Sequence, residues 1–428
     1  MSKSSVFFDR QERISWWNQE NLAKAKVLIV GAGALGNEAI KNLALLGIGQ
    51  MLIVDFDIIE DSNLSRAVLF RMQDAENKAA KADVAALRAR ELNPNPAAKV
   101  TSLLGNIVTD MGLGVYRHAD VVLGCLDNIE ARQFVNLQCW KVDKTWIDGG
   151  MWELAGSVSV YDAAEEKACY ECSMTNEHRA AAKKRYSCSI GVVKSYIKQG
   201  YEPTTQTTSA VIGAIQAQEV VKILHELPTF SGRRFMFNGT PHFYTIHDNN
   251  PVYMIELTIR DDCLCHREDK LSSVVEMEDA TNQMHIEDLM SLLEQKFGKQ
   301  NYIIEFDKHS PFIVSAICPN CTTEKHIDKP KSKVFDFEIV CPTCSFICPT
   351  CRKESVGVPH CPNCGQEDIQ KPELISFPRI SKKGEWYEKY KDKTLEDLGI
   401  PPLHILSIRS SQEKFYIELS GDFSKIWE

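Results

Sequence analysis

No run of 18 apolar residues occurs in the 428-residue sequence, so no membrane-spanning helix is expected. The N-terminal segment, MSKSSVFFDRQERISWW, is charged and lacks the apolar core of a secretory signal, so we expect a cytoplasmic protein. Acidic residues outnumber basic ones by 58 to 49, and the net charge of −9 argues against nucleic acid as a partner. Low-complexity segments and long internal repeats are absent too. What remains is a globular protein of roughly three domains, at ~150 residues each.

Cysteine, by contrast, is plentiful and regularly spaced, with 15 in the chain. In a chain without a secretory signal, paired cysteines at short spacing indicate zinc rather than disulfides. Five C-x-x-C pairs and one C-x-C pair account for most of them: Cys169/Cys172, Cys318/Cys321, Cys341/Cys344, Cys348/Cys351, Cys361/Cys364 and Cys263/Cys265.

Short apolar runs alternate with helical patterns through the first 150 residues. Near-continuous apolar strands between helices predict a parallel sheet covered on both faces. Residues 151–262 indicate further, antiparallel strands around one long helix at 204–225. The N-terminal part is therefore expected to be an α/β domain with a mixed sheet.

The hexapeptide Gly31–Gly36, GAGALG, follows the first predicted strand and opens a helix. Glycines permit a tight turn and a close approach of the backbone, and the helix N-terminus offers N–H donors to a phosphate. Asp55 ends the second predicted strand, where an acidic side chain can bind a ribose. Alone, this motif suits NAD, FAD and ATP alike, so an NAD-dependent oxidoreductase is one alternative.

The next segment, Asp55–Arg66 (DFDIIEDSNLSR), is not needed by a dehydrogenase. It resembles the D-x-D…S-N-L-x-R signature of the adenylate-forming ThiF–MoeB superfamily. That superfamily includes the ubiquitin-activating enzymes and the sulfur-carrier adenylyltransferases of thiamin and molybdopterin synthesis. The resemblance continues through Asn77–Ala79, Gly124–Asn128 and Arg132, and covers about residues 1–265. It implies a Rossmann-like adenylation domain, which we place at residues 1–267.

The implied reaction joins a carboxylate to the α-phosphate of ATP and expels pyrophosphate. Cations must neutralise the charge on the phosphate oxygens, and Mg²⁺ suits carboxylate and phosphate ligands. By resemblance, Arg66 and Lys78 contact the phosphates and Asp127 holds Mg²⁺. Arg13, with Arg10 as second candidate, reaches the triphosphate of the other subunit in a symmetric homodimer. The implied nucleotide-binding residues are Gly31, Ala32, Gly33, Leu35, Gly36, Asp55 (to the ribose), Asp57 (near the attacking carboxylate), Asn63, Arg66, Lys78, Asp127 and Asn128.

The resemblance also makes Cys169 and Cys172 half of a zinc site, with Cys263 and Cys265 as the other half. Four thiolates around a tetrahedral ion make a closed structural site. Members of the family usually carry C-x-x-C at the second position, where this chain has C-x-C. His266 is therefore an alternative ligand.

Cys188 stands alone in a basic segment, about residues 175–200, which we expect to form a crossover loop. In ubiquitin-type activating enzymes, a cysteine at this place attacks the acyl-adenylate and becomes a thioester. Neighbouring Lys183, Lys184 and Arg185 would lower the pKa of this thiol. The alternative is a sulfur-carrier adenylyltransferase, which can hold a cysteine here without a stable thioester.

Three further regions are predicted after residue 267: a small α/β linker region at 268–317, a double zinc ribbon at 318–370 and a small α+β, β-grasp-like domain at 371–428. Short ribbons lack a core of their own, so zinc would supply their folding energy. With the site above, this makes up to three zinc sites. The spacing favours Cys318, Cys321, Cys341 and Cys344 for one ribbon and Cys348, Cys351, Cys361 and Cys364 for the other, with interleaved pairing as the alternative.

Ubiquitin-type activating enzymes end in a domain of this kind, which receives the conjugating enzyme. We therefore expect an enzyme that binds MgATP and adenylates the C-terminal glycine of a ubiquitin-like protein. The glycine would pass to Cys188 as a thioester and then to a conjugating enzyme. The compact size favours a prokaryotic pathway. The main alternative is a sulfur-carrier-protein adenylyltransferase, and a zinc-ribbon scaffold without enzyme activity is another.

Overall fold

The computed structural model of the chain describes residues 7–165, 167–174, 204–239, 250–306, 311–358, 360–366, 370–411 and 413–427. The chain forms two compact units. The first contains the described residues from 7 to 174, from 204 to 272 and from 422 to 427, and the second contains those from 273 to 421. Within the described ranges, a search for a helix long and apolar enough to cross a membrane finds none.

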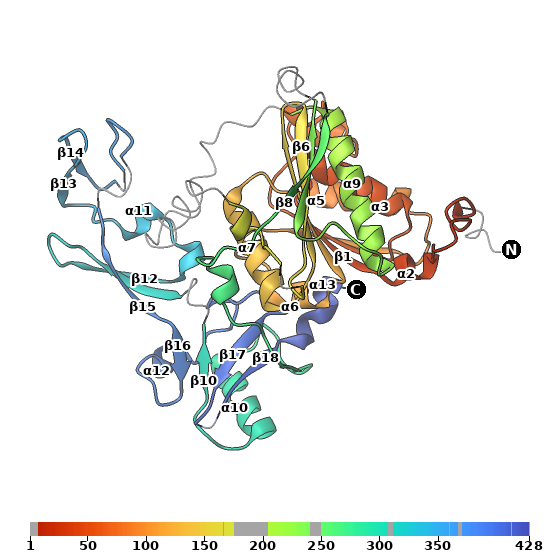
Figure 1. Cartoon of the computed structure of the whole chain (residues 1–428). Helices are drawn as coiled ribbons and strands as arrows, with labels where there is room; N and C mark the ends of the chain where they lie inside the picture. The colour runs from red at the N-terminus through yellow and green to blue at the C-terminus, as the bar shows by residue number, and fades with distance from the viewer. Residues whose placement is uncertain are drawn as a thin grey trace. The chain divides into compact units, whose positions relative to one another are not determined.

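An eight-stranded mixed sheet in the order β3-β2-β1-β4-β5-β6-β7-β8 forms the centre of the first unit (Figure 1). Neighbours are parallel from β3 to β5 and antiparallel from β5 to β8. The central strands carry apolar residues at nearly every position because both faces of a parallel sheet are covered. The strands are β1 (Lys26–Val30), β2 (Gln50–Asp55), β3 (Lys99–Leu104), β4 (Val121–Gly124), β5 (Trp146–Trp152), β6 (Ala155–Tyr161), β7 (Arg233–Asn238) and β8 (Val252–Glu256).

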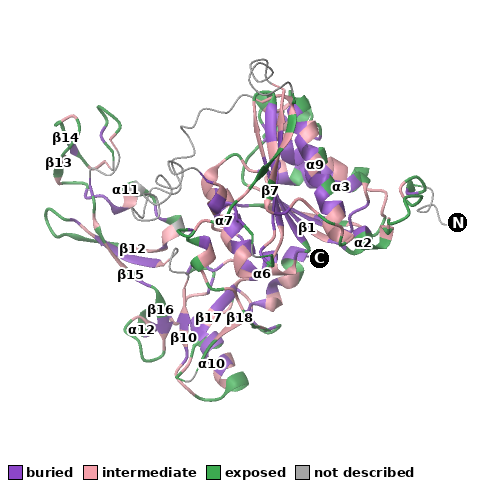
Figure 2. Cartoon of the chain, viewed as in Figure 1, coloured by how far each residue is buried: buried purple, intermediate pink, exposed green. Residues whose placement is uncertain are grey.

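Helices cover both faces of this sheet (Figure 1). Helix α3 packs against α5 and α9 on one face, and α6 packs against α7 on the other. Figure 2 shows that burial is concentrated in the strands between them. The expected α/β architecture with a mixed sheet is confirmed. The helices of this unit are α2 (Gln19–Lys24), α3 (Ala34–Leu45), α4 (Met72–Glu76), α5 (Lys81–Leu92), α6 (Leu113–His118), α7 (Ile129–Lys141), α9 (Gln206–Leu224) and α13 (Phe423–Trp427).

The second unit is α+β, with a five-stranded sheet in the order β16-β10-β17-β18-β9 and a smaller sheet in the order β12-β11-β15. A third, two-stranded sheet pairs β13 with β14. Helix α10 (Ile286–Phe297) buries its apolar side in the core formed with the five-stranded sheet. The strands are β9 (Val274–Glu276), β10 (Ile303–Glu305), β11 (Phe312–Ile317), β12 (Glu324–Pro330), β13 (Ser345–Ile347), β14 (Glu354–Val356), β15 (Glu373–Phe377), β16 (Arg379–Ser381), β17 (Ile405–Arg409) and β18 (Lys414–Glu418).

The domain boundaries after residue 267 differ from those expected. The predicted linker region, 268–317, and the predicted C-terminal domain, 371–428, contribute strands to the same sheet, because β10 pairs with β16 and β17 while β9 pairs with β18. The buried residues of α10 share one hydrophobic core with residues from both segments. The cysteine-rich segment is thus an insertion between β11 and β15. The last residues, in α13, belong to the first unit.

Candidate active site and metal centres

The glycine motif forms the turn between β1 and α3. Gly31 has φ +98°, and a Cβ there would lie 2.4 Å from the Cys125 carbonyl oxygen. A Cβ on Gly36 would lie 2.0 Å from the Gly31 carbonyl oxygen. At Gly33, the N-cap of α3, a Cβ would meet no described atom within 4 Å. A side chain on Gly31 or Gly36 would therefore clash with backbone atoms. Gly33 borders open space at the helix N-terminus, where an anion can bind.

Asp55 fastens this turn to the end of β2. One carboxylate oxygen accepts the Ala32 N–H at 2.7 Å, and the other accepts the Asp57 N–H at 2.8 Å. Burial raises the pKa of Asp55, and the positive charge of Lys81 opposes that rise. The ribose contact expected for Asp55 stays a prediction, and the visible role of this side chain is to orient the turn.

Lys81 is a functional candidate that the sequence did not single out. Its ammonium lies 2.8 Å from an Asp57 carboxylate oxygen, and its side chain is only 12% exposed. A β-bridge between Ile58 and Ala80 brings the two segments together. Lys78, the expected phosphate ligand, lies in the same short segment, is exposed and has φ +48°. Lys81 lies outside every motif of the sequence analysis, so only its contact with Asp57 identifies it.

The remainder of the D-x-D…S-N-L-x-R segment folds into a short 3-10 turn, Asp61–Asn63. The Asn63 side-chain oxygen accepts the Glu60 N–H at 3.0 Å. The Arg66 guanidinium donates to the Ser62 carbonyl oxygen at 2.7 Å and is partly exposed. These bonds hold the loop in place while leaving part of the Arg66 guanidinium accessible.

Asp127 follows β4 and is exposed. The neighbouring Asn128 caps α7, because its side-chain oxygen accepts the Ala131 N–H at 2.7 Å. Strands β2 and β4 both run parallel to β1, so the glycine turn, Asp55 and Asp127 follow the carboxyl ends of three adjacent strands. Ligands of open α/β sheets bind at this edge.

A buried ion pair supports the Asp127 turn. Arg132 of α7 lies 2.9 Å from an Asp148 carboxylate oxygen. Its guanidinium also donates to the carbonyl oxygens of Leu126 and Gly149. Burial raises the pKa of Asp148, and Arg132 opposes that rise. Arg132 belonged to the resemblance without a role, and Asp148 was missed because a single acidic residue in an apolar strand carries no motif.

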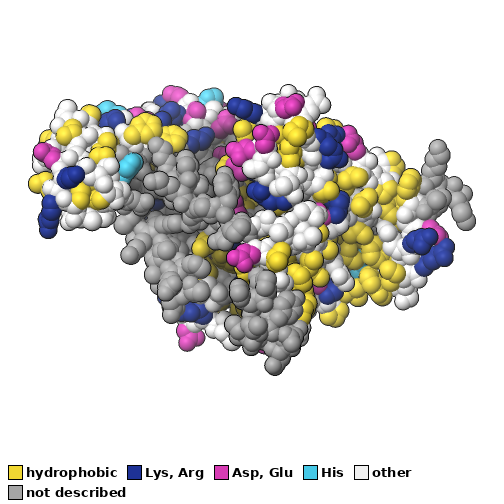
Figure 3. Space-filling view, turned by 90° about the horizontal axis from the view of Figure 1, so that it is seen from above, with side chains coloured by type: hydrophobic (Ala, Val, Ile, Leu, Met, Phe, Trp, Pro, Cys, Tyr) yellow, Lys and Arg dark blue, Asp and Glu magenta, His cyan; other side chains and the backbone are white. Residues whose placement is uncertain are grey.

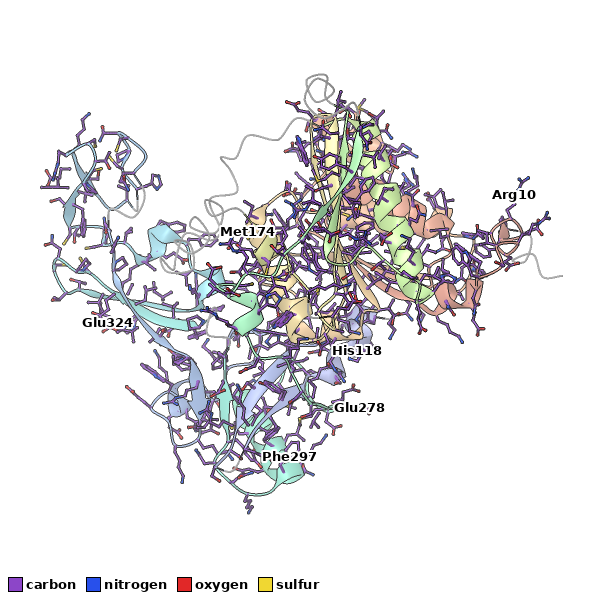
Figure 4. The ribbon with its side chains drawn as sticks, viewed as in Figure 1. Arg10, His118, Met174, Glu278, Phe297 and Glu324 are labelled. Carbon is purple, nitrogen blue, oxygen red and sulfur yellow. The ribbon has the colours of Figure 1, made fainter. Side chains whose placement is uncertain are left out.

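The N-terminal arginines are exposed. Arg13 pairs with Asp9 at 2.6 Å, and its side chain is 74% exposed. Figure 4 shows Arg10 projecting outward from the same segment. Phe7, Ile14 and Trp16 are exposed there as well, and Figure 3 shows hydrophobic side chains gathered on the surface of this unit.

Cys188 lies outside the described residues, as do its basic neighbours and the rest of the segment 175–200. Two other cysteines, Cys125 and Cys139, are buried, and burial raises the pKa of both thiols. These two therefore pack as core side chains.

The first cysteine cluster differs from the expected set. Ligand atoms of Cys169, Cys172, Cys263 and His266 all lie within 4.8 Å of one another, and Cys265 is not in this group. The Cys169 sulfur lies 3.5 Å from that of Cys263 and 3.9 Å from that of Cys172. Zinc–sulfur bonds of about 2.3 Å in a tetrahedron set sulfurs about 3.8 Å apart, so the cluster fits a zinc ion.

The other eight cysteines form two groups by consecutive pairs, not by interleaving. Within each group the sulfurs lie within 4.8 Å of one another. The backbone repeats as well: Thr322, Arg352 and Gly365 each have positive φ and each donate an N–H to the first cysteine carbonyl of their pair. Hydrogen bonds from Thr343 lower the pKa of Cys341 to about 6, which favours the thiolate that a metal binds. The two groups are Cys318, Cys321, Cys341 and Cys344, and Cys348, Cys351, Cys361 and Cys364.

Comparison with known proteins finds a match to the family described as "ThiF family" over residues 8–262. The ThiS adenylyltransferase of Escherichia coli K12 is 29% identical over 221 residues, which cover 52% of this chain and 80% of that protein. The molybdopterin-synthase adenylyltransferase of Salmonella typhimurium is 30% identical over 223 residues, covering 52% and 82%. Ubiquitin-activating enzyme E1 1 of Candida albicans is 35% identical over 151 residues, covering 33% and 15%. The solved structure of E. coli MccB with ATP is 22% identical, with a TM-score of 0.45, covering 58% of this chain and 67% of that one.

Proposed function

The chain belongs to the ThiF family, and we propose that it is an ATP-dependent adenylyltransferase that activates the C-terminal glycine of a ubiquitin-like protein. One observation carries the proposal: the glycine turn, the Asp55–Arg66 segment and Asp127 follow the carboxyl ends of three adjacent parallel strands. Adenylyl transfer needs a phosphate-binding turn, cations and a carboxylate for Mg²⁺. The similarity to sulfur-carrier adenylyltransferases and to a ubiquitin-activating enzyme supports this reaction class.

In the proposed reaction, a carboxylate oxygen of the partner's terminal glycine attacks the α-phosphorus of ATP. The bond between that phosphorus and the bridging oxygen breaks, and pyrophosphate leaves. Arg66 and Lys78 neutralise the charge on the phosphate oxygens, while Asp57 lies beside the attacking carboxylate. Asp127 would hold Mg²⁺, which would supply further positive charge to the same oxygens. The proposed nucleotide contacts are Gly31, Ala32, Gly33, Leu35, Gly36, Asp55, Asp57, Asn63, Arg66, Lys78, Asp127 and Asn128.

We propose a symmetric homodimer in which Arg13, or Arg10 in its place, serves the nucleotide of the other subunit. The exposed guanidinium of Arg13 and the exposed apolar side chains of the same segment support a protein contact there. The three cysteine clusters are proposed as structural zinc sites. Their sulfur spacing and closed ligand sets suit an ion that stabilises the fold rather than one that takes part in the reaction.

We further propose that Cys188 takes the activated glycine as a thioester and that a conjugating enzyme receives it. The adenylate's carbonyl carbon is attacked by the Cys188 thiolate, and AMP leaves. The described residues of the second unit, which include most of the segment 371–428 that we propose to be β-grasp-like, lie outside the family match, which ends at residue 262. An additional α+β unit with two metal-stabilised ribbons suits a protein-docking role. The alternative, a sulfur-carrier adenylyltransferase, would use the adenylate without a conjugating enzyme.

Intact-mass spectrometry under non-reducing conditions tests the proposal. The chain is mixed with MgATP and a ubiquitin-like protein that ends in glycine, beside a Cys188→Ala variant. We expect an adduct that thiols cleave in the wild type and no adduct in the variant. Pyrophosphate exchange without any adduct would favour the sulfur-carrier alternative, and neither signal across a panel of such partners would contradict adenylation.

A further inference from the structure

We propose that the metal site of the first unit is held by three thiolates and one imidazole, from Cys169, Cys172, Cys263 and His266. Cys265 is a neighbouring thiol and not a ligand. The inference rests on the zinc occupancy proposed above and specifies its ligands. It replaces the four-thiolate set expected from the family resemblance.

The spacing along the chain supports this set. Cys169 and Cys172 are three positions apart, and so are Cys263 and His266, in the sequence Cys263-Leu264-Cys265-His266. A C-x-x-C pair and a C-x-x-H pair have the same spacing, so each of the two short turns can present two ligands in the same way. Pairing Cys263 with Cys265 would require a shorter spacing in one half of the site.

The surroundings of His266 also support its role as a metal ligand. Its Nδ1 atom lies 3.4 Å from the Cys172 sulfur. The ring packs edge-on against Trp140, with centroids 4.6 Å apart, and the Trp140 indole N–H is itself anchored to the Glu268 carbonyl oxygen at 3.0 Å. The other ring nitrogen, Nε2, is buried and has no hydrogen-bond partner among the described residues. Nδ1 is therefore the ring nitrogen that faces the cluster sulfurs, and its place among three thiols is explained by a metal ligand role.

Cys265 has a different partner. Its sulfur accepts a hydrogen bond from the Asn136 side-chain N–H at 3.1 Å. Asn136 is buried in α7, and its oxygen accepts the Tyr170 N–H at 2.9 Å, so its amide is fixed in orientation. The Glu171 carboxylate accepts the Cys265 N–H at 3.1 Å and so fixes the backbone of the turn. Cys265 also lies outside the group of mutually close ligand atoms, so these bonds fix the turn that presents Cys263 and His266.

The ligand set changes the charge of the site. Zn²⁺ with three thiolates and a neutral imidazole carries a net charge of −1, whereas four thiolates give −2. The two ribbon sites, with four cysteines each, serve as internal references of the four-thiolate type.

Cadmium-113 NMR of the full chain, with zinc replaced by ¹¹³Cd, tests the assignment because the chemical shift reports how many sulfurs bind each ion. We expect three signals, two in the four-sulfur range and one shifted upfield into the range of three sulfurs and one nitrogen. Cys265→Ser should leave all three signals and the metal content of three per chain unchanged. His266→Cys should move the third signal into the four-sulfur range.

Three signals in the four-sulfur range, with one displaced by Cys265→Ser, would overturn the ligand assignment while leaving zinc occupancy intact. A metal content of two per wild-type chain, with both signals in the four-sulfur range, would instead overturn occupancy of this site. The two failures are therefore distinguishable in the same experiment.

Discussion

Arg132 and Asp148 form a buried ion pair, 2.9 Å apart, that joins α7 to β5 directly behind the turn carrying Asp127. The same guanidinium donates to the carbonyl oxygen of Leu126, the residue before Asp127. The position of the proposed Mg²⁺ ligand is therefore fixed by a side chain that lies five residues along the chain.

Removing one partner of this pair should destabilise the fold. Asp148→Ala leaves an uncompensated buried cation, and such losses cost about 3–5 kcal/mol. The change in the free energy of unfolding can be measured by urea unfolding, with circular dichroism as the signal. The exposed pair of Lys24 and Glu20 provides the control, because Glu20→Ala should leave the free energy of unfolding almost unchanged. Equal effects of the two substitutions would contradict the role given to Asp148.

Two glycines of the turn should respond differently to the same substitution. Gly31→Ala forces a Cβ into a position 2.4 Å from a carbonyl oxygen at φ +98°, so it should destabilise the protein by more than about 1–3 kcal/mol. Gly33→Ala has room and φ −71°, so stability should barely change while the KM for ATP rises. Thermal unfolding measures the loss of stability, and the dependence of ATP–pyrophosphate exchange on ATP concentration measures the KM. An unchanged ATP KM for Gly33→Ala would argue against phosphate binding at this turn.

Lys81 should set the pH range of the reaction. Burial raises the pKa of Asp55, and the positive charge of Lys81 lowers it. Lys81→Met removes the lowering effect, so the pKa of Asp55 rises further and its ionised form is lost at a higher pH. The acid limb of the pH profile for ATP–pyrophosphate exchange should then move to higher pH. Lys24→Met, at an exposed position, is the control and should leave the profile unchanged.

The ribbon cysteines should be needed for metal content but not for adenylation. Cys361→Ser removes one ligand of a closed site, and small zinc-dependent folds lose their structure without the ion. Native mass spectrometry should show zinc falling from three to two per chain. Pyrophosphate exchange should survive, because the proposed active site lies in the other unit. Loss of exchange at unchanged stability of the first unit would assign the ribbons a direct part in the reaction.

Local pattern was enough to predict the parts of the fold that depend on neighbours in sequence. The strand before Gly31 and the consecutive pairing of Cys348/Cys351 with Cys361/Cys364 are of this kind. Pairing between distant segments was not predictable, since the three residues of β10 carry no signal that their partners lie in β16 and β17. His266 stayed an alternative because the family resemblance favoured four cysteines and therefore Cys265. Geometry distinguishes the two, because a ring nitrogen of His266 lies within 4.8 Å of the other three ligand atoms and Cys265 is not in that group.

The most direct test of the account is ATP–pyrophosphate exchange by the full chain with a ubiquitin-like protein that ends in glycine. We predict exchange that depends on MgATP and on the partner, that is lost when the partner's last glycine is deleted, and that falls at least tenfold in Asp127→Ala. Cys188→Ala should retain exchange, since adenylation precedes the thioester. Exchange that is absent with every such partner, or that proceeds equally well after deletion of the glycine, would contradict the account.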